Sequence, residues 1–108
     1  MSAAAWALGD LQGKLADENY ARELGKQYAK TAIGLALARA RMARHLTQDE
    51  LAARVGVRQS YIAQLESGEA NPTIAKVGQI MAVLGFRLAA SPEEWTPAPT
   101  WNEGQLLR

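Results

Sequence analysis

Residues 47–66 read TQDELAARVGVRQSYIAQLE, and this stretch predicts two short helices joined by a tight turn. Thr47 with Glu50 three residues later is a capping-box pattern, which starts a helix. Gly56 can adopt the positive φ angle that ends this helix and turns the chain sharply into the next one. The positions expected to face inward are apolar or small: Leu51, Ala52, Val55, Val57, Ile62 and Leu65.

The second of these helices begins with polar side chains that a hydrophobic core does not need. Arg58, Gln59 and Ser60 lie in its first turn, and Gln64 follows one turn later. Arg58 is a poor N-cap, because it offers no short acceptor and its cation opposes the positive helix end. Arginine and glutamine form paired hydrogen bonds with base edges in the major groove, which a helix N-terminus can enter. Each residue alone also fits a solvated surface, but the whole pattern predicts binding to double-stranded DNA.

Helices are also predicted on both sides of this pair, because apolar residues recur there at intervals of three and four. One helix covers about Thr31 to Arg44. The other starts after an N-cap at Thr73 and ends at Gly85. The residues expected on their inner faces are Ile33, Leu37 and Ala40 in the first, and Ile74, Val77, Ile80 or Met81, and Leu84 in the second. The sequence therefore predicts an all-α fold with a four-helix domain at residues 31–85.

Residues 1–30 are predicted to form a helical extension made of two pieces, with a cap at Asp17 between them. The residues that follow helical spacing are Leu8, Leu11 and Leu15 in the first piece, and Tyr20, Leu24 and Tyr28 in the second. Glycines in both pieces weaken the helix by about 1 kcal/mol each relative to alanine. The extension should therefore need something to pack against, either the protein's own core or another chain.

Residues 86–108 are predicted to hold little regular structure. Residues 86–90 form a short alternating segment that fits an edge strand paired with its mate across a two-fold axis, or an irregular exit from the helix. From Ser91 onward three prolines prevent regular structure and make the tail irregular. Trp95 and Trp101 are large apolar side chains in this polar tail, so we expect them to dock on a dimer or on a partner.

The composition argues against several other classes of protein. There is no cysteine and only one histidine, so neither a disulfide framework nor a metal site is expected. Carboxylates do not occur at catalytic spacing, so neither an enzyme active site nor a cofactor is expected. Residues 30–68 carry six basic and three acidic groups although the chain's net charge is only +1, so positive charge gathers around the motif. The lack of a signal peptide or a long apolar run predicts a cytoplasmic protein without a membrane span.

Residues 41–85 resemble the Cro/cI-type helix-turn-helix proteins, also called the XRE family. The matching residues are Arg41, Leu46, Thr47, Gln48, Leu51, Ala52, Gly56, Val57, Ile62, Leu65, Glu66, Gly68, Asn71, Pro72, Thr73, Leu84 and Gly85. The resemblance implies a lambda-repressor-like bundle. Gly78 departs from the family, which usually has a larger residue there.

The resemblance also implies roles for individual side chains. Gln48 is implied to contact phosphate, and the residues implied to face the bases are Arg58, Gln59, Ser60 and Gln64. Arg41 and Glu66 are implied to form a structural ion pair between the first and third helices of the domain. Arg44 and Arg54 would be supporting phosphate contacts, or else solvated surface.

The layout of the whole chain resembles HigA-type antitoxins of type II toxin–antitoxin modules. An acidic, tyrosine-bearing segment at residues 17–24 leads into the first domain helix, and residues 85–88 follow the last. This resemblance implies an autorepressor that neutralises a RelE/HigB-like toxin through the extension or the tail, and the alternative is a stand-alone or phage repressor. Because one small domain seldom binds DNA tightly alone, we expect a homodimer on a palindromic operator.

Overall fold

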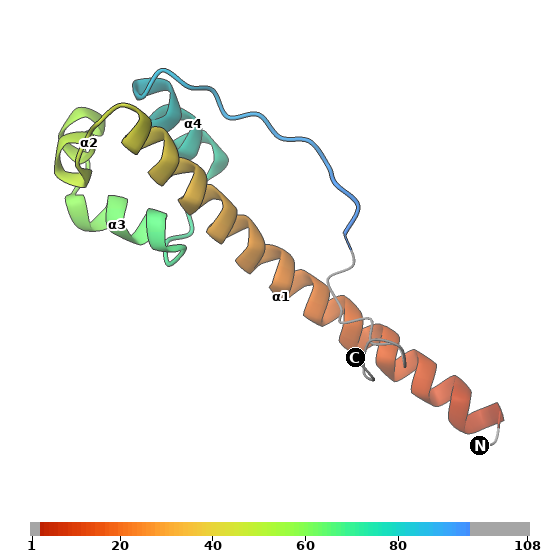
Figure 1. Cartoon of the computed structure of the whole chain (residues 1–108). Helices are drawn as coiled ribbons and strands as arrows, with labels where there is room; N and C mark the ends of the chain where they lie inside the picture. The colour runs from red at the N-terminus through yellow and green to blue at the C-terminus, as the bar shows by residue number, and fades with distance from the viewer. Residues whose placement is uncertain (1–2, 96–108) are drawn as a thin grey trace, which may run out of the picture. The chain divides into compact units, whose positions relative to one another are not determined.

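The computed structural model describes residues 3–95, with side chains from Asp17 onward, and this part of the chain is all-α (Figure 1). Its helices are α1 (Ala3–Ala43), α2 (Gln48–Val55), α3 (Gln59–Ser67) and α4 (Ile74–Val83). Residues 27–91 form the compact unit that holds α2, α3, α4 and the C-terminal part of α1. The predicted all-α helix-turn-helix bundle is confirmed.

The extension and the first domain helix form a single helix, which corrects the prediction of separate pieces. α1 runs from Ala3 to Ala43 without a break at Asp17 or a new start at Thr31. The first proline of the chain is Pro72, so nothing in this segment removes a backbone donor. Its glycines lower helix stability, but they do not clash with the helical backbone. Asp17 therefore lies within the helix and does not cap it.

A hydrophobic core joins all four helices within residues 27–91. Its buried side chains are Leu37, Ala40, Leu46, Leu51, Ala52, Ile62, Leu65, Val77, Ile80, Met81 and Leu84. Ile33, Val55 and Val57 are partly buried against it. Ile74 was predicted to face inward, and this is wrong: 80% of its surface is exposed. Thr73 caps α4 by accepting a hydrogen bond from the Lys76 backbone amide. Ile74 is therefore the first residue of the helix and precedes the residues of α4 that pack against the core.

A close helix crossing places α1 against the end of α3. A Cβ atom added at Gly34 would lie 2.8 Å from the carbonyl oxygen of Glu66 and closer still to that of Leu65. Real Cβ atoms do not approach backbone oxygens this closely, so glycine is the residue that allows the two backbones to meet. Gly34 lies in an apolar run of α1 and was not among the residues predicted to be structurally important.

Residues 86–90 take no strand conformation in the described chain, so the alternative of an irregular exit from α4 is what the structure shows. Gly85 has a φ of 82° and follows the C-cap at Leu84. The Phe86 amide then donates to the Met81 carbonyl at 2.9 Å, and Leu88 packs against the core. Trp95 is exposed. Trp101 lies outside the described residues, so its predicted docking is not addressed.

Candidate nucleic-acid interface

α2 begins with the predicted capping box. The Glu50 amide donates to Thr47 Oγ1 at 3.0 Å, and the Thr47 amide donates to Glu50 Oε1 at 3.0 Å. These bonds satisfy two backbone donors that a helix N-terminus leaves without partners. The pKa of Glu50 is held below its usual value, mainly by the hydrogen bond from the Thr47 backbone. The hydrogen bond with the Thr47 side chain is the second cause of this lowering. The orientation of α2 is thus fixed from its first residue.

The turn between α2 and α3 depends on the backbone conformation of Gly56. Its φ is 81°, and its amide donates to the Ala52 carbonyl at 2.8 Å. A Cβ atom at this position would meet nothing within 4 Å, so the need for glycine comes from the left-handed backbone and not from crowding. The predicted glycine turn is confirmed.

An ion pair between Arg41 and Glu66 joins α1 to α3. Arg41 donates from Nε to Glu66 Oε2 at 2.7 Å and from Nη2 to Glu66 Oε1 at 2.8 Å, in the two-bond geometry that suits a guanidinium and a carboxylate. A third bond runs from Arg41 Nη1 to the Leu46 carbonyl. The side chains are only 15% and 9% exposed. Burial alone would raise the pKa of Glu66, but hydrogen bonds from Arg41 and Gln48 and the charge of Arg41 outweigh it, so the pKa is lowered.

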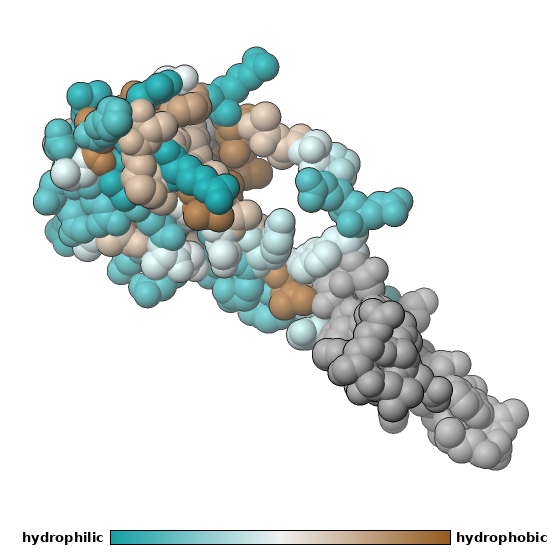
Figure 2. Space-filling view, in the orientation of Figure 1, coloured by the Kyte–Doolittle hydropathy of each residue, from teal (hydrophilic) through white to brown (hydrophobic). Residues whose placement is uncertain are grey.

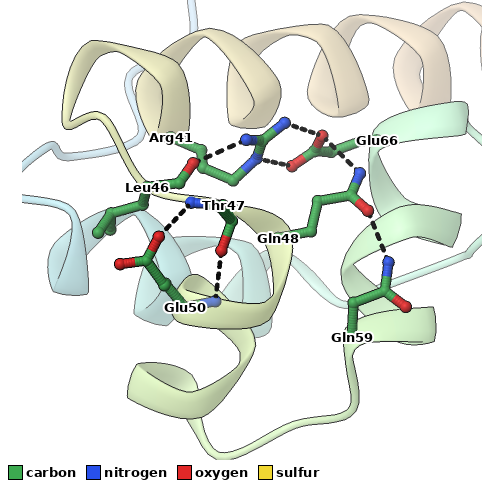
Figure 3. Close-up of polar contacts among 7 residues, drawn as sticks. All are labelled: Arg41, Leu46, Thr47, Gln48, Glu50, Gln59 and Glu66. Carbon is green, nitrogen blue, oxygen red and sulfur yellow. Dashed lines mark hydrogen bonds and ion pairs between the residues drawn. The ribbon is translucent and has the colours of Figure 1, made fainter.

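Two glutamines extend this ion pair toward the surface (Figure 3). Gln48 Nε2 donates to Glu66 Oε1 at 3.1 Å, and Gln59 Nε2 donates to Gln48 Oε1 at 2.7 Å. Because the Glu66 carboxylate only accepts, the Gln48 amide group must face it and its carbonyl must face Gln59. The four side chains form a continuous polar chain, which we call the Arg41–Gln59 chain. From the sequence, Gln48 was expected to contact phosphate and Gln59 to face the bases, and the hydrogen bond between them was not predicted.

The exposed end of this chain lies at the first turn of α3. Arg58 is the N-cap residue, and its side chain makes no capping hydrogen bond, as predicted from its chemistry. Gln59, Ser60 and Gln64 are also exposed. The first turn of α3 contains no acidic residue that would oppose a phosphate or a base acceptor. This arrangement brings a cation, an anchored amide and a hydroxyl to one helix tip.

Arg44 does not belong to this group. Its Nε donates to the Leu84 carbonyl at 2.7 Å, and its guanidinium lies over the Phe86 ring, 4.4 Å from the centroid. It therefore helps to cap α4 and holds the segment that follows, a structural role that the sequence did not indicate. Arg54 is exposed in the last turn of α2 and makes no hydrogen bond or ion pair with another described residue, although its charge helps to lower the pKa of Glu50. Of the two supporting arginines, Arg44 therefore has a structural role, and Arg54 remains a candidate for the phosphate contact.

Two negative findings apply to the described residues alone. In residues 3–95 no helix combines the length and the apolar character needed to cross a membrane. Nor does this part of the chain bring together three side chains of the types that could hold a metal ion. Figure 2 shows hydrophilic side chains over much of the visible bundle surface, with apolar patches between them.

Together, a capped short helix, a glycine turn, a steeply placed second helix and an exposed polar tip define a helix-turn-helix protein. The family model described as Helix-turn-helix (HTH_3) matches residues 37–90. The chain therefore belongs to the helix-turn-helix family, within its Cro/cI-type or XRE group.

Two curated proteins of Sinorhizobium fredii (strain NBRC 101917 / NGR234) are similar to this chain. One is the uncharacterized HTH-type transcriptional regulator y4dJ, 36% identical over 70 residues that cover 63% of this chain and 91% of that protein. The other is the uncharacterized HTH-type transcriptional regulator y4dL, 32% identical over 71 residues that cover 66% of this chain but only 36% of that protein.

Proposed function

We propose that the protein is a transcriptional repressor that binds a specific sequence of double-stranded DNA through the tip of α3. The observation that carries this proposal is the Arg41–Gln59 chain, which fixes an exposed amide at the N-terminus of α3 through bonds that reach back to α1. A side chain that is held in place loses less rotamer freedom when it meets a base edge. Solvated surface residues have no need for such anchoring.

The chemistry of the tip suits two kinds of DNA contact. Gln59 uses one amide hydrogen on Gln48, so its second hydrogen and its carbonyl oxygen are left for an adenine edge. Arg58 is exposed and suits the two acceptors of guanine. Gln48 keeps one amide hydrogen for phosphate, and the open backbone amides at the start of α3 add to the anion affinity.

The experiment that tests this function is a gel-shift assay on the DNA upstream of the protein's own gene. We expect a discrete complex at a protein concentration where scrambled DNA of the same length stays free. Equal affinity for both DNAs across a range of salt concentrations would contradict sequence-specific recognition, because phosphate contacts alone bind all sequences alike.

We further propose that the repressor acts as an antitoxin that represses its own operon and binds a RelE/HigB-like toxin. What supports this is the long extension of α1 together with an exposed Trp95, neither of which the DNA-binding surface requires. The alternative is a stand-alone repressor with the same DNA surface. Co-expression with each neighbouring gene product, followed by pull-down, separates them: a stable complex that relieves toxicity supports the antitoxin, and failure with every neighbour supports the stand-alone repressor.

A further inference from the structure

A groove of about 440 Å³ lies between α1 and the segment that follows α4, within the unit of residues 27–91. Its wall on α1 contains Ala36, Ala40 and Ala43, which recur at intervals of four and three and so share one face of the helix. Their short side chains leave the space that longer ones would fill. None of the residues that line the groove belongs to α2 or α3, so the helix-turn-helix pair takes no part in it.

The opposite wall of the groove is held in place by the protein's own contacts. The Phe86 amide donates to the Met81 carbonyl at 2.9 Å, and the Arg44 guanidinium lies 4.4 Å from the centroid of the Phe86 ring. Leu88 packs against the core. A surface that already has its shape loses little freedom when a partner binds. The groove is therefore preformed.

Exposed apolar side chains continue this surface along α1. Leu35 is 48% exposed and Met42 is 55% exposed, and each lies three or four residues from Arg39, which lines the groove. Leu35 and Met42 are seven residues apart, so the surface extends about 10 Å along the helix. Two turns of a partner helix with apolar residues at i, i+4 and i+7 match this length, whereas a small ligand in the groove would leave Leu35 and Met42 exposed. We call the groove, together with Leu35 and Met42, the arginine groove.

Both charged residues that line the groove are cationic. Arg39 and Arg87 are exposed, and neither makes a hydrogen bond or an ion pair with another described residue. Residues 27–48 and 70–91 contain no acidic residue. A guanidinium binds a carboxylate through two parallel hydrogen bonds, so two of them beside an apolar surface suit an acidic partner. The complementary surface is an apolar stripe with carboxylates beside it.

A second copy of this chain does not have that complementary surface. Closed dimers use the same patch on both copies, so a two-fold contact would bring Arg39 and Arg87 of one copy against those of the other. No carboxylate lines the groove to offset these charges. Like charges across an interface are unfavourable and suppress the wrong partner. Charge complementarity therefore favours a different protein.

We infer that the arginine groove binds an acidic amphipathic helix of another protein. The apolar stripe of that helix packs between the alanines of α1 and Phe86, with Leu35 and Met42 at its two ends. Its carboxylates pair with Arg39 and Arg87. This inference goes beyond the proposed DNA binding and does not rest on it, because no residue at the tip of α3 lines the groove.

Binding of a synthetic peptide tests this surface directly. The probe is a fluorescein-labelled helical peptide of about 18 residues, with leucines at i, i+4 and i+7 and glutamates on both sides of them. A control peptide carries lysine in place of every glutamate. In fluorescence anisotropy we expect the acidic peptide to bind the wild-type chain roughly tenfold more tightly than the control peptide, since two exposed ion pairs replace two repulsions.

Substitutions in the chain locate the bound peptide. Arg39→Glu combined with Arg87→Glu should reverse the preference, so that the lysine peptide binds more tightly. Lys76→Glu is the matched charge control, because Lys76 does not line the groove. Ala36→Phe should fill the groove and weaken binding, whereas Ala75→Phe changes an exposed alanine of α4 outside the groove and should leave binding unchanged. Circular dichroism checks that each variant keeps its helices.

The inference is overturned if both peptides bind the wild-type chain with equal affinity, or if the double arginine variant keeps the preference for the acidic peptide. It is also overturned if a folded Ala36→Phe variant binds as well as Ala75→Phe. Self-association of the wild-type chain that Arg39→Glu abolishes would assign the groove to a second copy instead. All these measurements are made without DNA, so their failure leaves the proposed DNA binding standing.

Discussion

At the level of single residues, Gln48 and Gln59 have different positions in one polar chain. Gln48 lies between the Glu66 carboxylate and the Gln59 amide, so both ends of its side chain are engaged. Gln59 is exposed and is held at one end only. The two glutamines should therefore respond differently to substitution, although both are proposed to act in DNA binding.

Replacing Gln59 by alanine should weaken operator binding by about 1–3 kcal/mol and relax the preference at one base position. Fluorescence anisotropy on the operator and on single-base variants measures both effects. Gln79→Ala is the matched control, because Gln79 is an exposed glutamine on α4. An equal loss on random DNA would count against direct readout by Gln59.

Replacing Gln48 by alanine should weaken binding to operator and random DNA alike, because the proposed phosphate contact does not depend on sequence. It should also flatten the dependence of affinity on salt concentration. The bond to Gln59 is lost as well, so some operator preference should go with it. A variant with unchanged affinity for random DNA would remove Gln48 from the phosphate contacts.

Acid should destabilise the fold partly through Glu66. Its pKa in the folded protein is lower than the value of about 4.5 expected when unfolded, so it stabilises the protein above that pH and stops doing so as the pH falls through the folded pKa. Glu66→Gln should lower stability near pH 7 by about 1–3 kcal/mol and make the fall below pH 4.5 shallower. Thermal unfolding from pH 3 to 7 measures this, and an unchanged pH profile would contradict it.

At the level of helices, two helical glycines in different surroundings should give opposite results. Gly34→Ala should destabilise the protein by about 2 kcal/mol or more, because its Cβ would collide with the backbone at the end of α3. Gly78→Ala should stabilise it by about 0.5–1 kcal/mol, since a Cβ there meets nothing within 4 Å. Urea unfolding of both variants tests the pair. Equal effects in one direction would refute the close crossing of α1 and α3.

Local signals in the sequence were enough to predict the short helices. The capping box at Thr47 and the glycine turn at Gly56 are short-range features, and both occur as predicted. The extent of α1 was harder to predict, because Asp17 can cap a helix but no residue nearby prevents the preceding helix from continuing. Ile74 was misassigned because helical spacing does not tell where a helix first meets its neighbours.

The candidate site was predictable as a set of residues but not as a network. Arg58 breaks the usual N-cap preference beside the polar Gln59 and Ser60, and that conflict is visible in the sequence. The bond between Gln48 and Gln59 joins two helices, and that between Arg44 and Leu84 spans 40 positions of the chain. Contacts of this kind depend on the tertiary structure, so the role of Arg44 at the end of α4 could not be deduced in advance.

For the molecule as a whole, DNA binding and partner binding are proposed for different parts of the chain. The tip of α3 is proposed to contact DNA, and the extension of α1 or the tail with Trp95 and Trp101 is proposed to contact a toxin. The homodimer expected from the sequence should place two α3 tips on one operator.

Footprinting of the DNA upstream of the protein's gene, with wild-type protein and with Gln59→Ala at low salt, tests the proposed DNA binding most directly. We expect two protected half-sites about 34 Å apart, one turn of the double helix, and loss of this protection in the variant. Uniform protection of the fragment, or none at any protein concentration, would contradict the proposal that α3 presents Arg58 and Gln59 to base pairs.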